Sequence, residues 1–382
     1  MKMYTFVINI YALTILLSLI YLAVSAGVIR TALRKALPGK APKKDWPAVT
    51  ILKPLKGIDD CLEDNLRSFM ELDYEAVEII FGLQDKNDPA LTIVNKLRSE
   101  YPQVHTQLII NERTSGLNPK VNNMINMYAH ARHPLILISD SNTRVENDYL
   151  QRMVAGLDDP SVGVVTSTVR GVGAKNFASV MENLHLNTFI TPNVFVAARL
   201  VNIPIVIGKA ILIRRETLRD IGGFHAFKLY LAEDYLIGLR SKEKGWHVKT
   251  INAFVNNVNQ FWSLKRFFNR HTRWAKMRRH MHLHHYLLES MSNPVAMSFI
   301  LMALRFDGIG VLQFALVTLL KLIYDAYVSA QMKSDLRWYH YPAGILKDLI
   351  IGVIWFVPFV SYKVKWRDNH LRISRYSYLQ PV

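Results

Sequence analysis

The stretch Leu135-Ile136-Leu137-Ile138-Ser139-Asp140-Ser141-Asn142 joins a short apolar run to a polar turn. A run of this length and composition predicts a β-strand in a buried sheet. The run itself predicts a strand at 135–139, and comparable runs predict strands at 49–53, 77–83, 107–110 and 162–168. Helical patterns near 60–70, 89–100, 120–131 and 147–156 lie between the runs. This alternation predicts an α/β fold, a Rossmann-like domain with a mostly parallel sheet.

Ligands of such sheets bind beyond the carboxyl ends of the strands, so we look for chemistry in the loops that follow them. Asp85 and Asp140 each follow a predicted strand. Asp85 could accept hydrogen bonds from a base or a ribose, whereas Asp88 before Pro89 has a helix cap as a sufficient role. Asp140 is either a turn residue or a ligand of a hard divalent metal that bridges phosphates.

Two further motifs each allow a structural and a functional interpretation. In Gly116-Leu117-Asn118-Pro119-Lys120, Asn and Pro suit a helix start, and an anion could bind at that helix N-terminus beside Lys120. In Leu231-Ala232-Glu233-Asp234-Tyr235, the two acids could begin a helix, or one of them could be a general base.

The segment Arg270-His271-Thr272-Arg273-Trp274 is the most basic of the motifs. Helical spacing places Arg266, Arg270 and Arg273 on one face, where the cations repel each other unless an anion or a carboxylate lies nearby. A diphosphate suits guanidinium groups well, while a basic helix lying on lipid headgroups is the structural alternative.

The two ends of the chain carry its long apolar runs. Residues 3–29 hold no charge and are long enough for one membrane helix. A cleaved signal peptide is the alternative, but the run is long and basic residues follow it, which favours an uncleaved anchor with that flank in the cytoplasm. These residues are Arg30, Arg34, Lys35, Lys40, Lys43 and Lys44.

Near the other end, residues 309–330 and 343–362 are long enough to span, whereas 294–304 is shorter and is expected to lie in the interface or re-enter. The tail after them is basic (Lys363, Lys365, Arg367, Arg372, Arg375), so it is also expected inside. The predicted organisation is a multi-pass membrane protein with an anchor at 1–30, a cytoplasmic domain at 45–290 and membrane segments with a basic tail at 291–382.

The formal net charge of +17 suits either nucleic acid or anionic lipid headgroups. The apolar runs favour the membrane, so no nucleic-acid partner is expected. The single cysteine, Cys61, excludes an internal disulfide and suits a reducing compartment.

Taken in order, these motifs resemble the membrane glycosyltransferases with a GT-A catalytic domain, of the ceramide glucosyltransferase type. The resemblance covers roughly residues 48 to 280, plus the membrane segment on each side, and rests on five segments. They are Gln84-Asp85 with Asp88-Pro89, Gly116-Leu117-Asn118-Pro119-Lys120-Val121-Asn122-Asn123, Asp140-Ser141-Asn142, Ala232-Glu233-Asp234-Tyr235 and Arg270-His271-Thr272-Arg273-Trp274.

The resemblance implies a role for each matching residue. Asp85 would contact the nucleoside of a nucleotide-sugar donor, and Lys53, Pro54 and Lys120 would line the donor pocket. Asp140 would hold a divalent metal, Mg or Mn, with Asn142 standing where a second acid is usual. Asp234 would be the catalytic base, and Arg270, Arg273 and Trp274 would grip the diphosphate and the acceptor end.

The expected reaction is an inverting transfer of a hexose from a nucleotide-diphosphate sugar, with UDP-glucose favoured, to a lipid hydroxyl, with ceramide favoured. The hopanoid-associated glycosyltransferases share these motifs, so a hopanoid acceptor stays open. A processive polysaccharide synthase would need more membrane helices than the predicted three. A non-catalytic basic membrane-binding protein would leave the ordered motifs unexplained.

Overall fold

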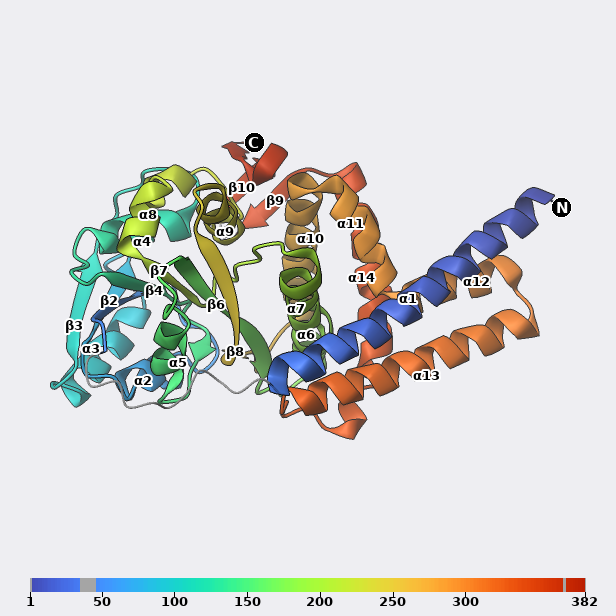
Figure 1. The fold of residues 1–382 in the computed structure, drawn as a ribbon, viewed down its shortest axis with the longest axis horizontal. Coiled ribbons are helices and arrows are strands. Elements are labelled where there is room, and N and C mark those ends of the chain that lie inside the picture. The colour runs from blue at the N-terminus through green and yellow to red at the C-terminus, as the bar shows by residue number, and fades with distance from the viewer. Residues whose placement is uncertain (1, 35–45, 367–368, 382) are drawn as a thin grey trace. The chain divides into compact units, whose positions relative to one another are not determined.

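The computed structural model describes residues 2–34, 46–366 and 369–381 (Figure 1). Contacts divide the chain into two compact units, each with its own buried core. Unit 1 comprises Met1–Leu33, Gly171–Val196 and Asn259–Val382. Unit 2 comprises Arg34–Arg170 and Ala197–Val258.

Unit 2 is built on an eight-stranded sheet with the order β3-β2-β1-β4-β7-β6-β8-β5. The strands are β1 (Val49–Pro54), β2 (Val77–Leu83), β3 (His105–Ile110), β4 (Leu135–Ile138), β5 (Thr143–Arg144), β6 (Val162–Val172), β7 (Ile211–Arg214) and β8 (His247–Val258). Strands β1 to β4 form the parallel half, since β1 pairs in parallel with β2 and β4, and β2 with β3. Strand β7 runs antiparallel to β4 and β6, and β5 runs antiparallel to β8.

Strands β1, β2 and β4 are mostly apolar because both faces of the sheet are covered there, whereas the edge strand β3 is only partly buried. Ile51, Ile79 and Leu137, one from each of three neighbouring strands, are fully buried. The predicted α/β class is confirmed, and the five predicted strands coincide with β1, β2, β3, β4 and β6 to within a few residues. The antiparallel pairing in the second half of the sheet was not predicted.

Unit 2 has helices at the four predicted positions, and two more, α8 and α9, lie later in the chain. The helices are α2 (Leu62–Met70), α3 (Ala90–Glu100), α4 (Pro119–Tyr128), α5 (Tyr149–Ala155), α8 (Arg215–Asp220) and α9 (Glu233–Glu243), with a short 3₁₀ turn at Phe224–Phe227. Helix α4 packs against β1 and β2. Its N-cap is Asn118, whose side chain accepts a hydrogen bond from the Val121 N–H at 3.0 Å, with Pro119 at the first helical position.

Asn122, in the first turn of α4, binds the loop that precedes this helix. Asn122 is 3% exposed, and its Oδ1 accepts hydrogen bonds from the N–H groups of Ser115 at 3.0 Å and Gly116 at 2.9 Å. Its Nδ2 donates to the Gly116 carbonyl at 2.8 Å. This part of the asparagine-rich motif therefore has a structural role.

Unit 1 is mainly helical. Its helices are α1 (Lys2–Arg34), α6 (Phe177–His185), α7 (Thr191–Val196), α10 (Leu264–Met281), α11 (Leu283–Glu289), α12 (Pro294–Arg305), α13 (Gly308–Gln331) and α14 (Ala343–Val360). A π-helical turn at Leu186–Ile190 joins α6 to α7, and short 3₁₀ turns lie at Ser290–Ser292 and Trp338–His340. Strands β9 (Lys363–Trp366), β10 (Asn369–Ile373) and β11 (Leu379–Pro381) form a small antiparallel sheet.

Within the described residues, three helical segments are long and apolar enough to cross a membrane: Lys2–Arg34, Gly308–Gln331 and Trp338–Val360. They coincide with the three predicted spans. The pair Leu283–Ser292 and Pro294–Arg305 is bent by 75°, as a broken span or a re-entrant loop would be. Of the basic residues expected to flank the spans, Lys35, Lys40, Lys43, Lys44 and Arg367 lie outside the described residues.

The long apolar helices carry buried charges that neutralise one another. Lys321 Nζ of α13 lies 2.5 Å from Asp325 Oδ1 and 3.3 Å from Asp348 Oδ2, and Lys347 Nζ lies 2.8 Å from Asp348 Oδ1. Ionisable groups are costly inside a membrane unless they pair. This network therefore fixes α13 against α14. Helix α1 packs on α12 and α13 through a cluster that contains Ile15.

The compact units cut across the predicted domain at 45–290. Residues 171–196 and 259–290 group with the terminal helices in unit 1. The boundaries at 30, 45 and 290 stay a prediction.

Replacing Asn122 with Ala should lower the free energy of unfolding by about 1–3 kcal/mol, because buried loop N–H groups lose their acceptor. A thermal-shift measurement in detergent tests this, with Asn95→Ala as the control because Asn95 is an exposed residue of α3. Equal melting temperatures for both variants would contradict the structural role of Asn122.

Candidate active site

The candidate site lies where the strand order of unit 2 changes direction. Strands β1, β2 and β3 lie side by side in chain order, whereas β4 pairs with β1 on the side opposite β2. Loops after strands on either side of such a switch point diverge and leave room for a ligand. Pro54 ends β1, Asp85 follows β2 and Asp140 follows β4, so all three lie at the same edge of the sheet.

Lys53 fixes the loop after β4. Its side chain is fully buried, and its Nζ donates to the Asp140 carbonyl at 2.7 Å and to Thr143 Oγ1 at 3.2 Å. Burial lowers the pKa of Lys53 well below its usual value. The ammonium also lies 3.8 Å from the centre of the Phe69 ring. These contacts support the loop, and a contact between Lys53 and a donor stays a prediction.

The Asp140 carboxylate lies between two lysines. Lys120 Nζ lies 2.9 Å from Asp140 Oδ1, and Lys209 Nζ lies 3.3 Å from Asp140 Oδ2. Lys209 Nζ also donates to Asn142 Oδ1 at 2.7 Å. Burial alone would raise the pKa of Asp140, but the two ammonium groups outweigh it and hold that pKa below its usual range.

Helix α9 begins with the predicted pair of acids at the same site. Lys120 Nζ lies 3.2 Å from Glu233 Oε1, so this lysine links Asp140 to the start of α9. Asn118 Nδ2 donates to Glu233 Oε2 at 3.2 Å, which joins the α4 cap to the same carboxylate. Asp234 Oδ2 accepts the Gly208 N–H at 2.8 Å.

A side chain at position 208 would displace the side chains of the site. A Cβ at this position would lie 2.8 Å from Asp234 Oδ2 and 3.0 Å from Lys120 Nζ. Its carbonyl accepts a hydrogen bond from Lys120 Nζ at 2.9 Å. The backbone before β7 therefore approaches both α4 and α9 directly and becomes part of the site.

The two acids of α9 are more basic than ordinary carboxylates. Burial raises the pKa of Asp234 above 3.8, against the opposing attraction of Lys120. Burial also raises the pKa of Glu233, and repulsion from Asp234 adds to the effect. A raised pKa makes a carboxylate a better proton acceptor, which suits a general base.

Asp85 has a different environment. It is exposed, and its Oδ1 accepts the Asn87 N–H at 2.8 Å. Asp88 is buried and accepts hydrogen bonds from the N–H groups of Gly57 at 2.8 Å and Ala90 at 2.9 Å. Asp88 therefore supports the start of α3, but the N-cap is Pro89 and not Asp88 as the sequence predicted. Asp85 keeps an exposed carboxylate after β2.

The predicted metal ligands are paired with an ammonium in this arrangement. Asp140 and Asn142 offer oxygens of the right chemistry, but the Lys209 ammonium bonds to both of them. Over residues 2–34, 46–366 and 369–381, no group of three or more His, Cys, Asp or Glu side chains is placed to hold a metal. Metal binding at Asp140 and Asn142 stays a prediction.

The basic motif, Arg270 to Trp274, belongs to unit 1, where the buried carboxylate of Glu182 contacts it. Arg270 Nη1 of α10 lies 2.9 Å from Glu182 Oε1 of α6, and His271 Nε2 lies 2.8 Å from Glu182 Oε2. The Arg270 guanidinium also lies 4.3 Å from the centre of the Trp274 ring. Glu182 thus supplies a carboxylate for Arg270, one of the three arginines predicted on this helix face. Arg273 is half-buried, and contacts of Arg270, Arg273 and Trp274 with a diphosphate stay a prediction.

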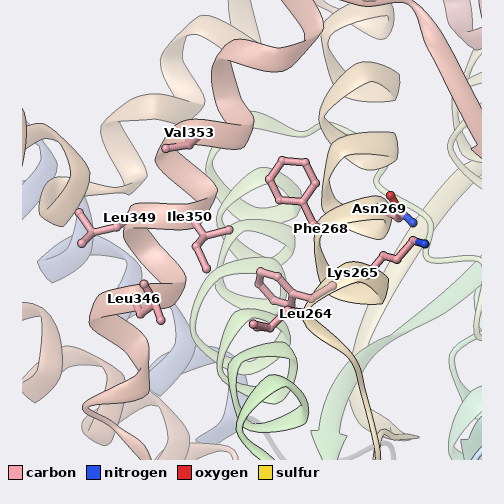
Figure 2. A pocket seen from close by; sticks show the side chains of 9 residues that line it. Leu264, Lys265, Phe268, Asn269, Leu346, Leu349, Ile350 and Val353 are labelled. Atoms are coloured by element: carbon pink, nitrogen blue, oxygen red, sulfur yellow. The ribbon is translucent and has the colours of Figure 1, made fainter.

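An apolar groove of about 590 Å³ lies between α10 and α14 of unit 1 (Figure 2). Its lining is almost entirely aliphatic and aromatic, with Lys265 and Asn269 at one side: Leu264, Lys265, Phe267, Phe268, Asn269, Leu346, Leu349, Ile350 and Val353. Such a lining suits a hydrocarbon chain rather than a sugar.

Comparison with known families decides the class of the protein. A model of glycosyl transferase family 21 matches residues 10–378, almost the whole chain. The chain belongs to glycosyl transferase family 21. The predicted resemblance to the ceramide glucosyltransferase type and the prediction of a glycosyltransferase are confirmed.

Curated relatives of this family 21 chain include two proteins of Caenorhabditis elegans. Ceramide glucosyltransferase 3 is 28% identical over 339 residues, which are 86% of this chain and 73% of the relative. Ceramide glucosyltransferase 1 is 28% identical over 272 residues, which are 70% of this chain and 58% of that relative. Among solved structures, the mannosyltransferase PcManGT from Pyrobaculum calidifontis in complex with GDP-Man and Mn²⁺ matches with a TM-score of 0.47 and 16% identity, covering 91% of this chain and 99% of that one.

The structure brings together Lys120, Asp140, Asn142 and Asp234, which the sequence had singled out separately. Lys209 was missed, although a lysine inside the apolar run 203–213 was an available signal. Glu182 was missed as well. Its signal was a lone acid within the apolar segment 177–200.

We expect the pH dependence of kcat/KM for sugar transfer to reflect the protonation of the Asp234 carboxylate. Because burial raises its pKa, kcat/KM should fall as the pH decreases through a value above 3.8, where the carboxylate takes up its proton and can no longer act as a base. Asp234→Asn should lose this acid limb together with roughly 10²–10⁴-fold of the rate. Glu243→Gln, at the exposed end of α9, is the control. An unchanged profile in Asp234→Asn would remove Asp234 as the base.

Proposed function

We propose that this protein is an inverting transferase that moves glucose from UDP-glucose to the hydroxyl of a ceramide-type lipid at the cytoplasmic membrane face. The observation that carries the proposal is the cluster of Lys120, Asp140 and Asp234 at the switch point of the sheet, in a family 21 chain. Ceramide glucosyltransferases of Caenorhabditis elegans, 28% identical to this chain, support the choice of donor and acceptor.

The proposed reaction is a single displacement. The acceptor oxygen forms a bond to C1 of the sugar and gives its proton to Asp234. The bond between C1 and the diphosphate breaks, and the nucleotide leaves with the electron pair. One displacement inverts the anomeric centre, so an α-linked donor gives a β-linked product.

Charge develops on the leaving diphosphate, and fixed cations lower the cost of that charge. Lys120 is suited to this work, because burial would lower its pKa but neighbouring carboxylates, led by that of Asp140, raise it above its usual value. It therefore keeps its charge at any physiological pH. Arg270 and Arg273 are proposed to bind a diphosphate, as the resemblance implies.

The apolar groove between α10 and α14 supports a lipid acceptor. It is lined on one side by a helix that is long and apolar enough to cross a membrane and on the other by the helix that carries Arg270 and Trp274. We propose that an acyl chain of the acceptor occupies it. Asp85 is proposed to contact the nucleoside, since its carboxylate is exposed at the end of β2.

Full-length protein in detergent should convert UDP-glucose and ceramide into a β-linked glucosylceramide, and Asp234→Asn should not. The assay pairs UDP-glucose, UDP-galactose and UDP-N-acetylglucosamine with ceramide or a hopanoid alcohol. Product on the hopanoid alone would overturn the ceramide assignment. Absence of any glycolipid with all of these pairs would overturn the transferase proposal itself.

Filling the groove should weaken lipid binding selectively. Ile350→Trp adds bulk to the lining and should raise KM for ceramide by about tenfold with KM for UDP-glucose unchanged. Val360→Trp is the control, because Val360 lies at the end of the same helix and is 83% exposed. Equal KM values for ceramide in the two variants would exclude the groove as the acyl site.

A further inference from the structure

Lys209 is the group at the site that neither the motifs nor the proposed mechanism explains. It follows Gly208 immediately before β7, and only 9% of it is exposed. Its Nζ lies 2.7 Å from Asn142 Oδ1 and 3.3 Å from Asp140 Oδ2. Both oxygens belong to the segment that the sequence assigned to a metal.

A divalent ion and the Lys209 ammonium would compete for one space. Mg²⁺ binds oxygen ligands at about 2.0–2.1 Å, so an ion held by Asp140 and Asn142 would lie within the volume that the ammonium fills. Two positive groups at such a separation repel strongly in a buried site. The ion could enter only if Lys209 withdrew from both oxygens.

Ammonium groups already accompany the carboxylates of the site. Lys120 and Lys209 both contact the carboxylate of Asp140, and Lys120 also contacts that of Glu233. A divalent ion in place of the Lys209 ammonium would add one more positive charge beside Lys120. Asn142 contributes an oxygen without a negative charge, which suffices as an acceptor for an ammonium but attracts a divalent ion less than an aspartate would.

The lysine is also positioned by a rigid turn. The Gly208 N–H donates to Asp234 Oδ2 at 2.8 Å, and the Gly208 carbonyl accepts from Lys120 Nζ at 2.9 Å. The residue after Gly208 therefore starts from a backbone that is fixed on both sides. A preorganised charge costs no reorganisation when charge develops nearby, which is what makes such groups effective in catalysis.

We propose that Lys209 is the built-in cation of this site: its ammonium, held by Asp140 and Asn142, neutralises the diphosphate of the donor in place of a divalent metal. The inference rests on the proposed function for the identity of the donor. It assigns a role in binding the diphosphate to a residue outside the recognised motifs, and it gives a reason for asparagine at position 142.

The test measures transfer and UDP binding by full-length protein in detergent, with EDTA or with added Mn²⁺. The wild-type protein should keep its rate in EDTA. Lys209→Met should lose about a hundredfold in rate in EDTA and regain part of it with Mn²⁺. The same variant should bind UDP about tenfold more weakly without metal. Lys209→Arg should keep both properties, and Lys244→Met, at the exposed C-cap of α9, is the matched control.

Binding of Mn²⁺, followed by electron paramagnetic resonance in the presence of UDP, separates this inference from the proposed function. Lys209→Met combined with Asn142→Asp should bind Mn²⁺, and the wild-type protein should not. If no sugar is transferred under any condition, the proposed function fails, whereas metal-free UDP binding that depends on Lys209 would still support the built-in cation. Loss of wild-type UDP binding in EDTA, restored by Mn²⁺ to the same extent in Lys209→Met, would overturn it.

Discussion

The carboxylate of Asp140, held between the ammonium groups of Lys120 and Lys209, is the interaction on which the arrangement of unit 2 depends. Each of the three residues comes from a different part of the sheet domain: the loop after β4, the start of α4 and the turn before β7. Lys209 is buried, and Lys120 and Asp140 are half-buried. Charges that lose contact with water are tolerated when they are paired and hydrogen-bonded. The strand order, the cap of α4 and the glycine at position 208 all serve to bring them within contact distance.

This pairing extends to the chemistry of α9. Lys120 also lies against Glu233, and the Gly208 backbone holds Asp234, so the proposed base is part of the same network. Burial raises the pKa of both acids, while the carboxylates around Lys120 raise the pKa of that lysine and keep it charged. A site of this kind separates two tasks, because the cations can oppose charge on a leaving group while a neighbouring carboxylate accepts a proton.

In unit 1, buried charges are also paired, through other residues. Glu182 neutralises Arg270 and contacts His271 in a fully buried position, and the lysines and aspartates of α13 and α14 neutralise one another. In an apolar or membrane environment an isolated charge would be too costly, so each charged residue in these helices indicates a partner. These pairs fix the helices that carry the basic motif and line the apolar groove.

The sequence by itself determined the α/β class, most of the strand and helix positions in the first half of the sheet, and the three long apolar helices. Hydrophobic periodicity and capping residues are local signals, and Asn118-Pro119 or the run at 135–138 needs no distant partner to be recognised. Motif order was also sufficient to predict the family.

Only the tertiary structure decided which charges meet. Lys209 lies 67 positions after Asn142 in the chain, and nothing in its local sequence says that its ammonium bonds to that amide. The same holds for Glu182 and Arg270, and for the antiparallel strands β7 and β8, whose partners are set by topology. Periodicity reports which face of an element is buried. A hydrogen bond between distant side chains depends on the position of the whole backbone, which is fixed only when the core has packed.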